Sequence, residues 1–66
     1  MRIRDFTQTE ADYLETVCNF TPDESQLFRL RLQDVPLEAC AEQMQISVPT
    51  VNRIHKRVID KIKKEI

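Results

Sequence analysis

The spacing of apolar residues along this chain of 66 residues is that of helices. Apolar positions recur every three or four residues, as they do on one face of a helix. The chain contains no Gly, which disfavours the tight hairpin turns of a sheet. The pattern predicts an all-α domain of four helices, which we place at residues 8–19, 22–33, 36–44 and 48–65.

Local signals mark where the predicted helices begin. Thr7 with Glu10, and Thr21 with Glu24, have the spacing of capping boxes, in which a Thr hydroxyl and a carboxylate satisfy each other's backbone N–H groups. Pro36 is expected to open the third helix, because proline is tolerated in a first helical turn. The residues expected to face inward are Ala11, Leu14, Val17 and Cys18, then Leu27, Phe28, Leu30 and Leu32, then Leu37, Cys40, Ala41 and Met44, and finally Val51, Ile54, Val58 and Ile62, with Ile59 and Ile66 extending the last stripe.

Residues 36–56 follow the pattern of a helix-turn-helix, and the rest of the single domain, residues 1–66, is expected to pack around them. Ala41 takes the small-residue position where the two helices cross closely. Gln45 stands at the turn position that adopts a left-handed conformation, for which most such sequences use Gly. Ser47 is a favourable N-cap for the last helix.

The first six residues, Met1–Phe6, are predicted to form a short arm. Its two basic residues, Arg2 and Arg4, suit contact with a DNA phosphate or the minor groove. A frayed terminus is the expectation we favour.

Charge is distributed unevenly along the chain, although the net charge is only −1. Residues 1–45 hold four Arg and nine acidic residues, whereas residues 46–66 hold six Lys or Arg and two acidic residues. A basic segment on one helix is typical of a DNA-contacting element. The alternative is a solvated surface whose basic end complements the helix dipole.

Other classes of function receive little support from the sequence. No apolar run approaches the roughly 20 residues that span a bilayer, and no signal peptide is evident, so we expect a cytoplasmic protein. Cys18 and Cys40 are expected to be reduced, buried thiols, and with a single His they do not match a metal site. We expect neither an enzyme nor a bound cofactor, because no nucleophile and base are paired.

The outward side of the last helix carries the candidate binding residues. An α-helix fits the major groove, where Asn pairs with adenine and Arg with guanine. The residues expected to read bases are Ser47, Val48, Pro49, Asn52, Arg53 and Lys56, and those expected to contact phosphates are Thr50, Arg57 and Lys61. The alternative for Asn52 is a solvated polar residue, and that for Arg53 and Lys56 is a solvated charged face. Lys61 has the alternative of a solubilising lysine, and His55 that of a half-buried packing residue.

Residues 20–62 resemble the DNA-binding region 4 of sigma-70-type factors and the DNA-binding domain of LuxR-type regulators. The matching residues are Phe20-Thr21-Pro22 with Glu24, Leu27-Phe28, Leu30-Arg31, Glu38, Cys40-Ala41-Glu42, Met44, Ile46-Ser47-Val48, Thr50-Val51 and Lys61-Ile62. The resemblance implies a four-helix arrangement, binding in the major groove and the same six base-reading positions.

The sequence therefore favours a sequence-specific transcriptional regulator that binds double-stranded DNA, and we expect it to act as a homodimer. Either the stripe of Ile59, Ile62 and Ile66 or the first helix would form the dimer interface. The alternative is a protein-interaction module whose acidic first half binds RNA polymerase, an anti-sigma type protein or another transcription factor.

Overall fold

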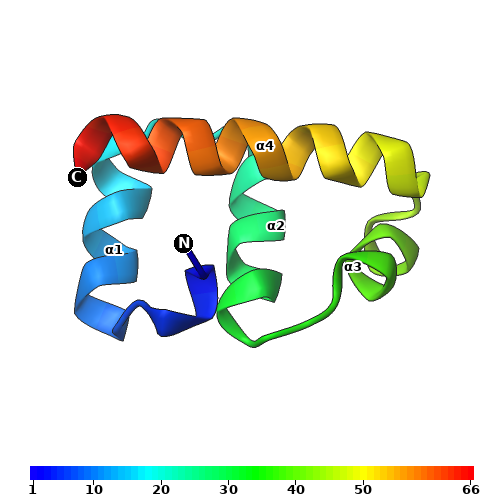
Figure 1. Cartoon of the computed structure of the whole chain (residues 1–66), viewed down its shortest axis with the longest axis horizontal. Coiled ribbons are helices and arrows are strands. Elements are labelled where there is room, and N and C mark those ends of the chain that lie inside the picture. The colour runs from blue at the N-terminus through cyan, green and yellow to red at the C-terminus, as the bar shows by residue number, and fades with distance from the viewer.

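The computed structural model describes residues 1–66 and is entirely helical, with no strand, as the apolar spacing predicted. A single 3-10 turn precedes four α-helices (Figure 1). In chain order the elements are η1 (Ile3–Asp5), α1 (Gln8–Val17), α2 (Pro22–Leu32), α3 (Leu37–Met44) and α4 (Val48–Glu65). None of these helices is both long and apolar enough to cross a bilayer.

The helices begin where the capping signals place them. In both capping boxes the Thr hydroxyl accepts from the backbone N–H three residues on, and the Glu carboxylate accepts from the backbone N–H of the Thr. Pro36 is an exception to the prediction, because it is extended (φ −60°, ψ 151°) and α3 begins one residue later, at Leu37.

The first two helices end earlier than predicted. Helix α1 ends at Val17 rather than at residue 19, and α2 ends at Leu32 rather than at residue 33. Both ends precede a residue with positive φ, Asn19 at 54° and Asp34 at 61°. Asn and Asp enter this left-handed region more readily than other non-glycine residues, and the conformation turns the chain away from the helix axis.

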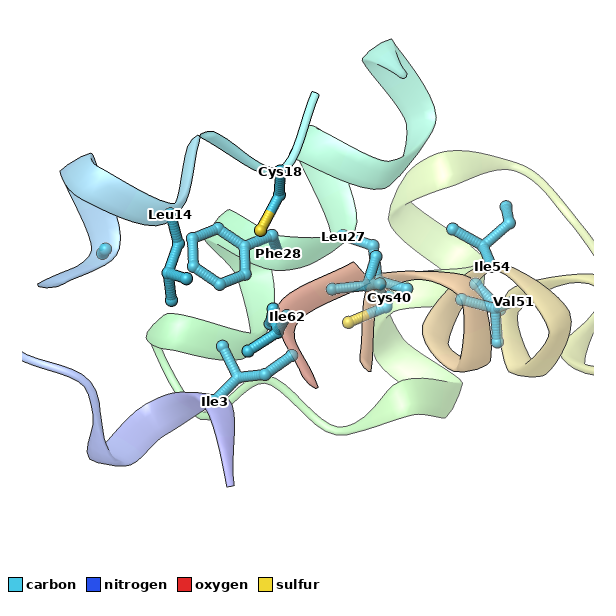
Figure 2. Packing of buried hydrophobic residues seen from close by; sticks show 12 residues of the cluster. Ile3, Leu14, Cys18, Leu27, Phe28, Cys40, Val51, Ile54 and Ile62 are labelled. Carbon is cyan, nitrogen blue, oxygen red and sulfur yellow. The ribbon is translucent and has the colours of Figure 1, made fainter. Parts of the chain in front are cut away.

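The core lies along one side of α4, which runs across the other three helices (Figure 1). Figure 2 shows side chains from α1, α2, α3 and α4 converging on it. Its buried apolar residues are Ile3, Ala11, Leu14, Cys18, Leu27, Phe28, Cys40, Ala41, Val51, Ile54, Val58 and Ile62. Every residue of this cluster except Ile3 was predicted to face inward.

The first residues of the chain pack against the core, and the expectation of a frayed arm was wrong. The side chain of Ile3 is only 3% exposed and, in Figure 2, points toward Ile62. The guanidinium of Arg4 forms an ion pair with Asp34 at 2.9 Å. Burial of Ile3 and this pairing fix η1 beside α2.

The end of α4 differs from the predicted inward stripe at its last residue, Ile66. Ile66 is 73% exposed and does not extend the inward stripe. Ile62 is fully buried inside the domain. Because Ile62 packs in the core of its own chain, as predicted, it has no exposed surface to add to a dimer interface with Ile59 and Ile66.

Candidate nucleic-acid interface

Gln45 forms the turn that joins α3 to α4. Its backbone is left-handed (φ 58°, ψ 44°), as its position in the motif predicted. The turn is closed by the N–H of Ile46, which donates to the carbonyl of Ala41 at 3.0 Å, and by the N–H of Gln45, which donates to Glu42 at 3.2 Å. These bonds satisfy carbonyl groups that the end of a helix otherwise leaves unpaired.

Small and branched residues set how closely α3 and α4 approach. Cys40 and Ala41 of α3 are buried, and Val51 and Ile54 of α4 are buried with them in one cluster. The Cys40 thiol donates to the carbonyl oxygen of Val35 at 3.6 Å. Tight packing on this side leaves the opposite side of the first turns of α4 facing solvent.

The first turn of α4 is held by its own side chains. The Ser47 hydroxyl accepts from the backbone N–H of Thr50 at 3.3 Å, which is the cap that the sequence predicted. The hydroxyls of Ser47 and Thr50 lie 2.8 Å apart, and an Arg53 nitrogen donates to the Thr50 hydroxyl at 3.4 Å. Three of the predicted binding residues are therefore linked to one another at the surface.

All six predicted base-reading residues are exposed on this part of α4. Val48, at 42%, is one of the few large apolar side chains with substantial exposure. The hydrogen bonds on this face involve Ser47, Thr50 and Arg53, and the three ion pairs of the chain lie elsewhere. The amide of Asn52 and the ammonium group of Lys56 thus have no partner within the chain.

A hollow of about 280 Å³ separates this face from the start of α2. Thr50, Arg53 and Arg57 line its α4 side, and Asp23 is among the residues on its α2 side. Arg53 and Arg57 are four residues apart and so lie one above the other on the same side of α4. That the start of α2 borders Arg53 and Arg57 was not predicted, since nothing in the local sequence indicates the angle at which α2 crosses α4.

Lys61 lies one turn beyond Arg57 and is already engaged within the chain. Its ammonium group donates to the Glu24 carboxylate and, at 3.2 Å, to the carbonyl oxygen of Asn19. Of the three predicted phosphate-contacting residues, Lys61 alone has its charged group occupied by an ion pair.

Burial and neighbouring charges shift the pKa of Glu24 in opposite directions. Removal from water would by itself raise the pKa of this carboxyl group. The effect of burial is outweighed by hydrogen bonds from Lys61 and from the backbone of Thr21, and by the charges of Lys61 and Arg57. The pKa of Glu24 therefore lies below its ordinary value. Glu24 is therefore ionised at neutral pH and neutralises Lys61.

Three further groups with a shifted pKa, His55, Cys18 and Cys40, are half-buried or buried. His55 is half-buried, and removal from water, assisted by the charge of Arg31, lowers its pKa, so the ring is neutral at pH 7. Burial raises the pKa of the thiols of Cys18 and Cys40, which keeps both protonated. The exposed cations of α4 are thus Lys and Arg side chains rather than a titrating histidine.

Helix α1 lies at the opposite end of α4 from the exposed face (Figure 1). No Lys or Arg occurs between residues 5 and 28, and α1 carries Glu10, Asp12 and Glu15. The molecule therefore has an acidic helix α1 beside the basic last turn of α4, and a face of basic and amide side chains at the start of α4. Searches for related proteins found no matching family model, no matching curated protein and no matching solved structure.

Proposed function

We propose that this chain is a helix-turn-helix transcriptional regulator that binds double-stranded DNA in a sequence-specific manner. In this proposal α3 crosses above the groove, and the first two turns of α4 enter the major groove. One observation carries this proposal: the amide of Asn52 and the ammonium group of Lys56 are exposed and have no partner within the chain. They lie next to Arg53 on α4, and the turn at Gln45 fixes where this helix starts.

The exposed side chains suit the edges of base pairs. An Asn amide can both donate to and accept from adenine, and an Arg guanidinium or a Lys ammonium can donate to guanine. Val48 and Pro49 are apolar and small enough to contact a thymine methyl. Ser47, Asn52, Arg53 and Lys56 would then supply the polar base contacts.

Phosphates would be held at the sides of the reading face. Thr50 and Arg57 border the hollow beside α2, and a phosphate would meet their hydroxyl and guanidinium groups outside it, because Asp23 and Glu24 line its α2 side. Contacts of this kind add affinity and orient the helix but carry no sequence information. Lys61 is left out of this set, because releasing it from Glu24 would leave a buried carboxylate unpaired.

Selection of bound duplexes from a random pool is the first test of this proposal. Enrichment of a common sequence is the expected result, and two such sequences related by a two-fold axis would indicate a dimer. Failure to enrich any sequence, together with no binding even at low salt, would exclude the proposal.

Substitutions then separate base readers from phosphate contacts. Replacing Asn52 or Arg53 by Ala should cost about 1–3 kcal/mol on the selected sequence and relax the preference at one base pair. Arg57→Ala should weaken binding to all sequences alike. It should also lower the slope of the logarithm of affinity against the logarithm of salt concentration by about one unit. Lys64→Ala is the matched control, since this lysine lies at the far end of α4.

A second candidate function is suggested by the charge of α1. An acidic surface with no Lys or Arg between residues 5 and 28 suits a basic protein segment, such as one in RNA polymerase or in an anti-sigma type partner. Under this alternative, Asp12→Lys, at an exposed residue of α1 without an ion pair, would abolish partner binding while Arg53→Ala would not. DNA binding that depends on Arg53 favours the first proposal.

A further inference from the structure

We propose that Thr50 is a positioning residue, whose hydroxyl holds the guanidinium of Arg53 toward the first turn of α4 and thereby sharpens the base preference of Arg53. An Arg53 nitrogen donates to the Thr50 hydroxyl oxygen at 3.4 Å. This role rests on the proposed function, in which Arg53 reads a base, and it goes beyond a phosphate contact by Thr50.

The Thr50 hydroxyl is an acceptor with a well-defined position. Its oxygen lies 2.8 Å from the hydroxyl oxygen of Ser47, which in turn accepts from the backbone N–H of Thr50 at 3.3 Å. Thr50 is half-buried, and a β-branched side chain has few χ1 rotamers in a helix. Ser47 and the helix backbone therefore fix the oxygen to which Arg53 donates.

The hydrogen bond directs Arg53 toward the part of α4 that meets the bases in the proposed complex. Thr50 precedes Arg53 by three residues, so the two lie on the same side of the helix, and the guanidinium points toward the N-terminal turn. In a helix-turn-helix, the N-terminal residues of the second helix contact the base edges. Lys56, three residues further on, has no partner within the chain to direct its ammonium group.

Enough donors remain on Arg53 to pair with a base. A guanidinium carries several N–H donors, of which Thr50 accepts one. The others can pair with the O6 and N7 atoms of guanine, as Arg does in the major groove. The hydroxyl of Thr50 has one hydrogen to donate, to Ser47 or to a phosphate, while it accepts from Arg53.

Asp23 is a competing partner for Arg53. The two residues border the same hollow of about 280 Å³, together with Thr50 and Arg57. They form no ion pair in the structure. A guanidinium that turned to Asp23 would leave the bases and lose its net charge, so the hydrogen bond to Thr50 maintains Arg53 in an orientation that can bind DNA.

Ordering of Arg53 before binding explains how Thr50 affects affinity. An arginine side chain loses rotamer freedom when a base holds it, and this loss weakens binding. Arg53 has lost part of that freedom in the free chain, because Thr50 already holds it. A single exposed hydrogen bond is weak, so we expect a change of about two- to tenfold in affinity rather than a complete loss.

Two substitutions separate the hydroxyl of Thr50 from the rest of its side chain. Thr50→Val keeps the branched shape without the hydroxyl, and it should raise the dissociation constant for the selected duplex by about two- to tenfold. Thr50→Ser keeps the hydroxyl and should bind nearly as the wild type does. Thr16→Val is the matched control, because Thr16 is an exposed threonine of α1 whose hydroxyl donates to the carbonyl oxygen of Asp12.

The base preference separates positioning from loss of a phosphate contact or of stability. Thr50→Val should relax the preference at the same base pair as Arg53→Ala, and at no other. In the Arg53→Ala background, Thr50→Val should not change this preference further, because the two residues act through one contact. If Thr50→Val instead weakens binding to all sequences alike, Thr50 contacts phosphate only, and the positioning role is overturned.

NMR of the chain without DNA tests the contact by itself. The order parameter of the Arg53 Nε–H group should exceed that of Arg57, which lies on the same helix, is exposed and has no ion pair. It should fall to the value of Arg57 in Thr50→Val and stay high in Thr50→Ser.

The outcomes distinguish this inference from the proposed function. An Arg53 no more ordered than Arg57, or a Thr50→Val variant with the wild-type base preference, overturns the positioning role even if DNA is bound. Order of Arg53 that depends on the Thr50 hydroxyl upholds the positioning role even if no DNA sequence is selected, and the proposed function alone then fails. The same order together with a preference relaxed at one base pair upholds both.

Discussion

The ammonium group of Lys61 in α4 donates a hydrogen bond to the carboxylate of Glu24 in α2. Glu24 is the buried charged residue of the chain, and its carboxylate also accepts from the N–H of Thr21 at 3.0 Å. The same lysine donates to the carbonyl oxygen of Asn19. This pair therefore fixes the turn between α1 and α2 against the last third of α4.

Replacing Lys61 by Met should destabilise the domain by about 2 kcal/mol. The change leaves Glu24 buried without its cation, and the expected loss is below that of a fully buried pair because Lys61 is partly exposed. Urea unfolding measures the effect. Lys64→Met, at an exposed and unpaired lysine, is the control, and equal stability of the two variants would contradict the role given to the pair.

Stability should fall in acid partly through Glu24. Because its pKa in the folded chain lies below the ordinary value of 4.5, the unfolded chain takes up this proton at a higher pH than the folded chain does. The carboxylate therefore contributes stability above that ordinary value, and the contribution is lost as the pH falls through the folded pKa.

The Glu24→Gln variant isolates this contribution, since Gln still accepts the capping bond from Thr21. Urea midpoints measured across the acid range should show wild type more stable than the variant at neutral pH. The difference should shrink as the pH falls below 4.5. If the difference in urea midpoint between wild type and variant stays constant with pH, the charge of Glu24 does not contribute to that difference.

Gln45→Gly should stabilise the domain by about 0.5–1 kcal/mol. A non-glycine residue in the left-handed region costs about 1–2 kcal/mol, which is partly offset by the extra freedom that glycine has when unfolded. Gln43→Gly, inside α3, is the matched control and should destabilise by about 1 kcal/mol. If both variants lose stability, the turn is not strained.

Ala41→Leu should cost about 1–3 kcal/mol through overpacking between α3 and α4. Ala41 is buried at this crossing, whereas Ala39 on the same helix is only half-buried. Ala39→Leu should therefore have a smaller effect. Equal unfolding midpoints for the two variants would show that α3 and α4 do not approach closely at Ala41.

Local sequence signals predicted the helices well because each signal acts over a few residues. A Thr and a Glu three positions apart form a capping box whatever the rest of the chain does, and Ser47 caps α4 in the same way. The inward stripes were predictable for a similar reason, since helical periodicity alone decides which residues share a face. The left-handed conformation of Gln45 followed from its place in the motif.

Features that depend on distant residues were not predictable. Ile3 stands between two arginines, and its burial arises from packing on residues of α2 and α4 far along the chain. Lys61 and Glu24 are 37 positions apart, so no local pattern connects them, and Lys61 was predicted to contact phosphate. The hollow beside Arg53 and Arg57 depends likewise on how α2 crosses α4.

The burial of Ile3 beside Ile62 has a consequence for how the domain unfolds. Chain ends usually fray first and exchange their amide hydrogens fastest. Here the first turn and the last helix close the core together, so neither separates without exposing Phe28. Unfolding should accordingly be a single cooperative transition, in which amides near Ile62 exchange at the rate of global opening despite lying so near the end of the sequence.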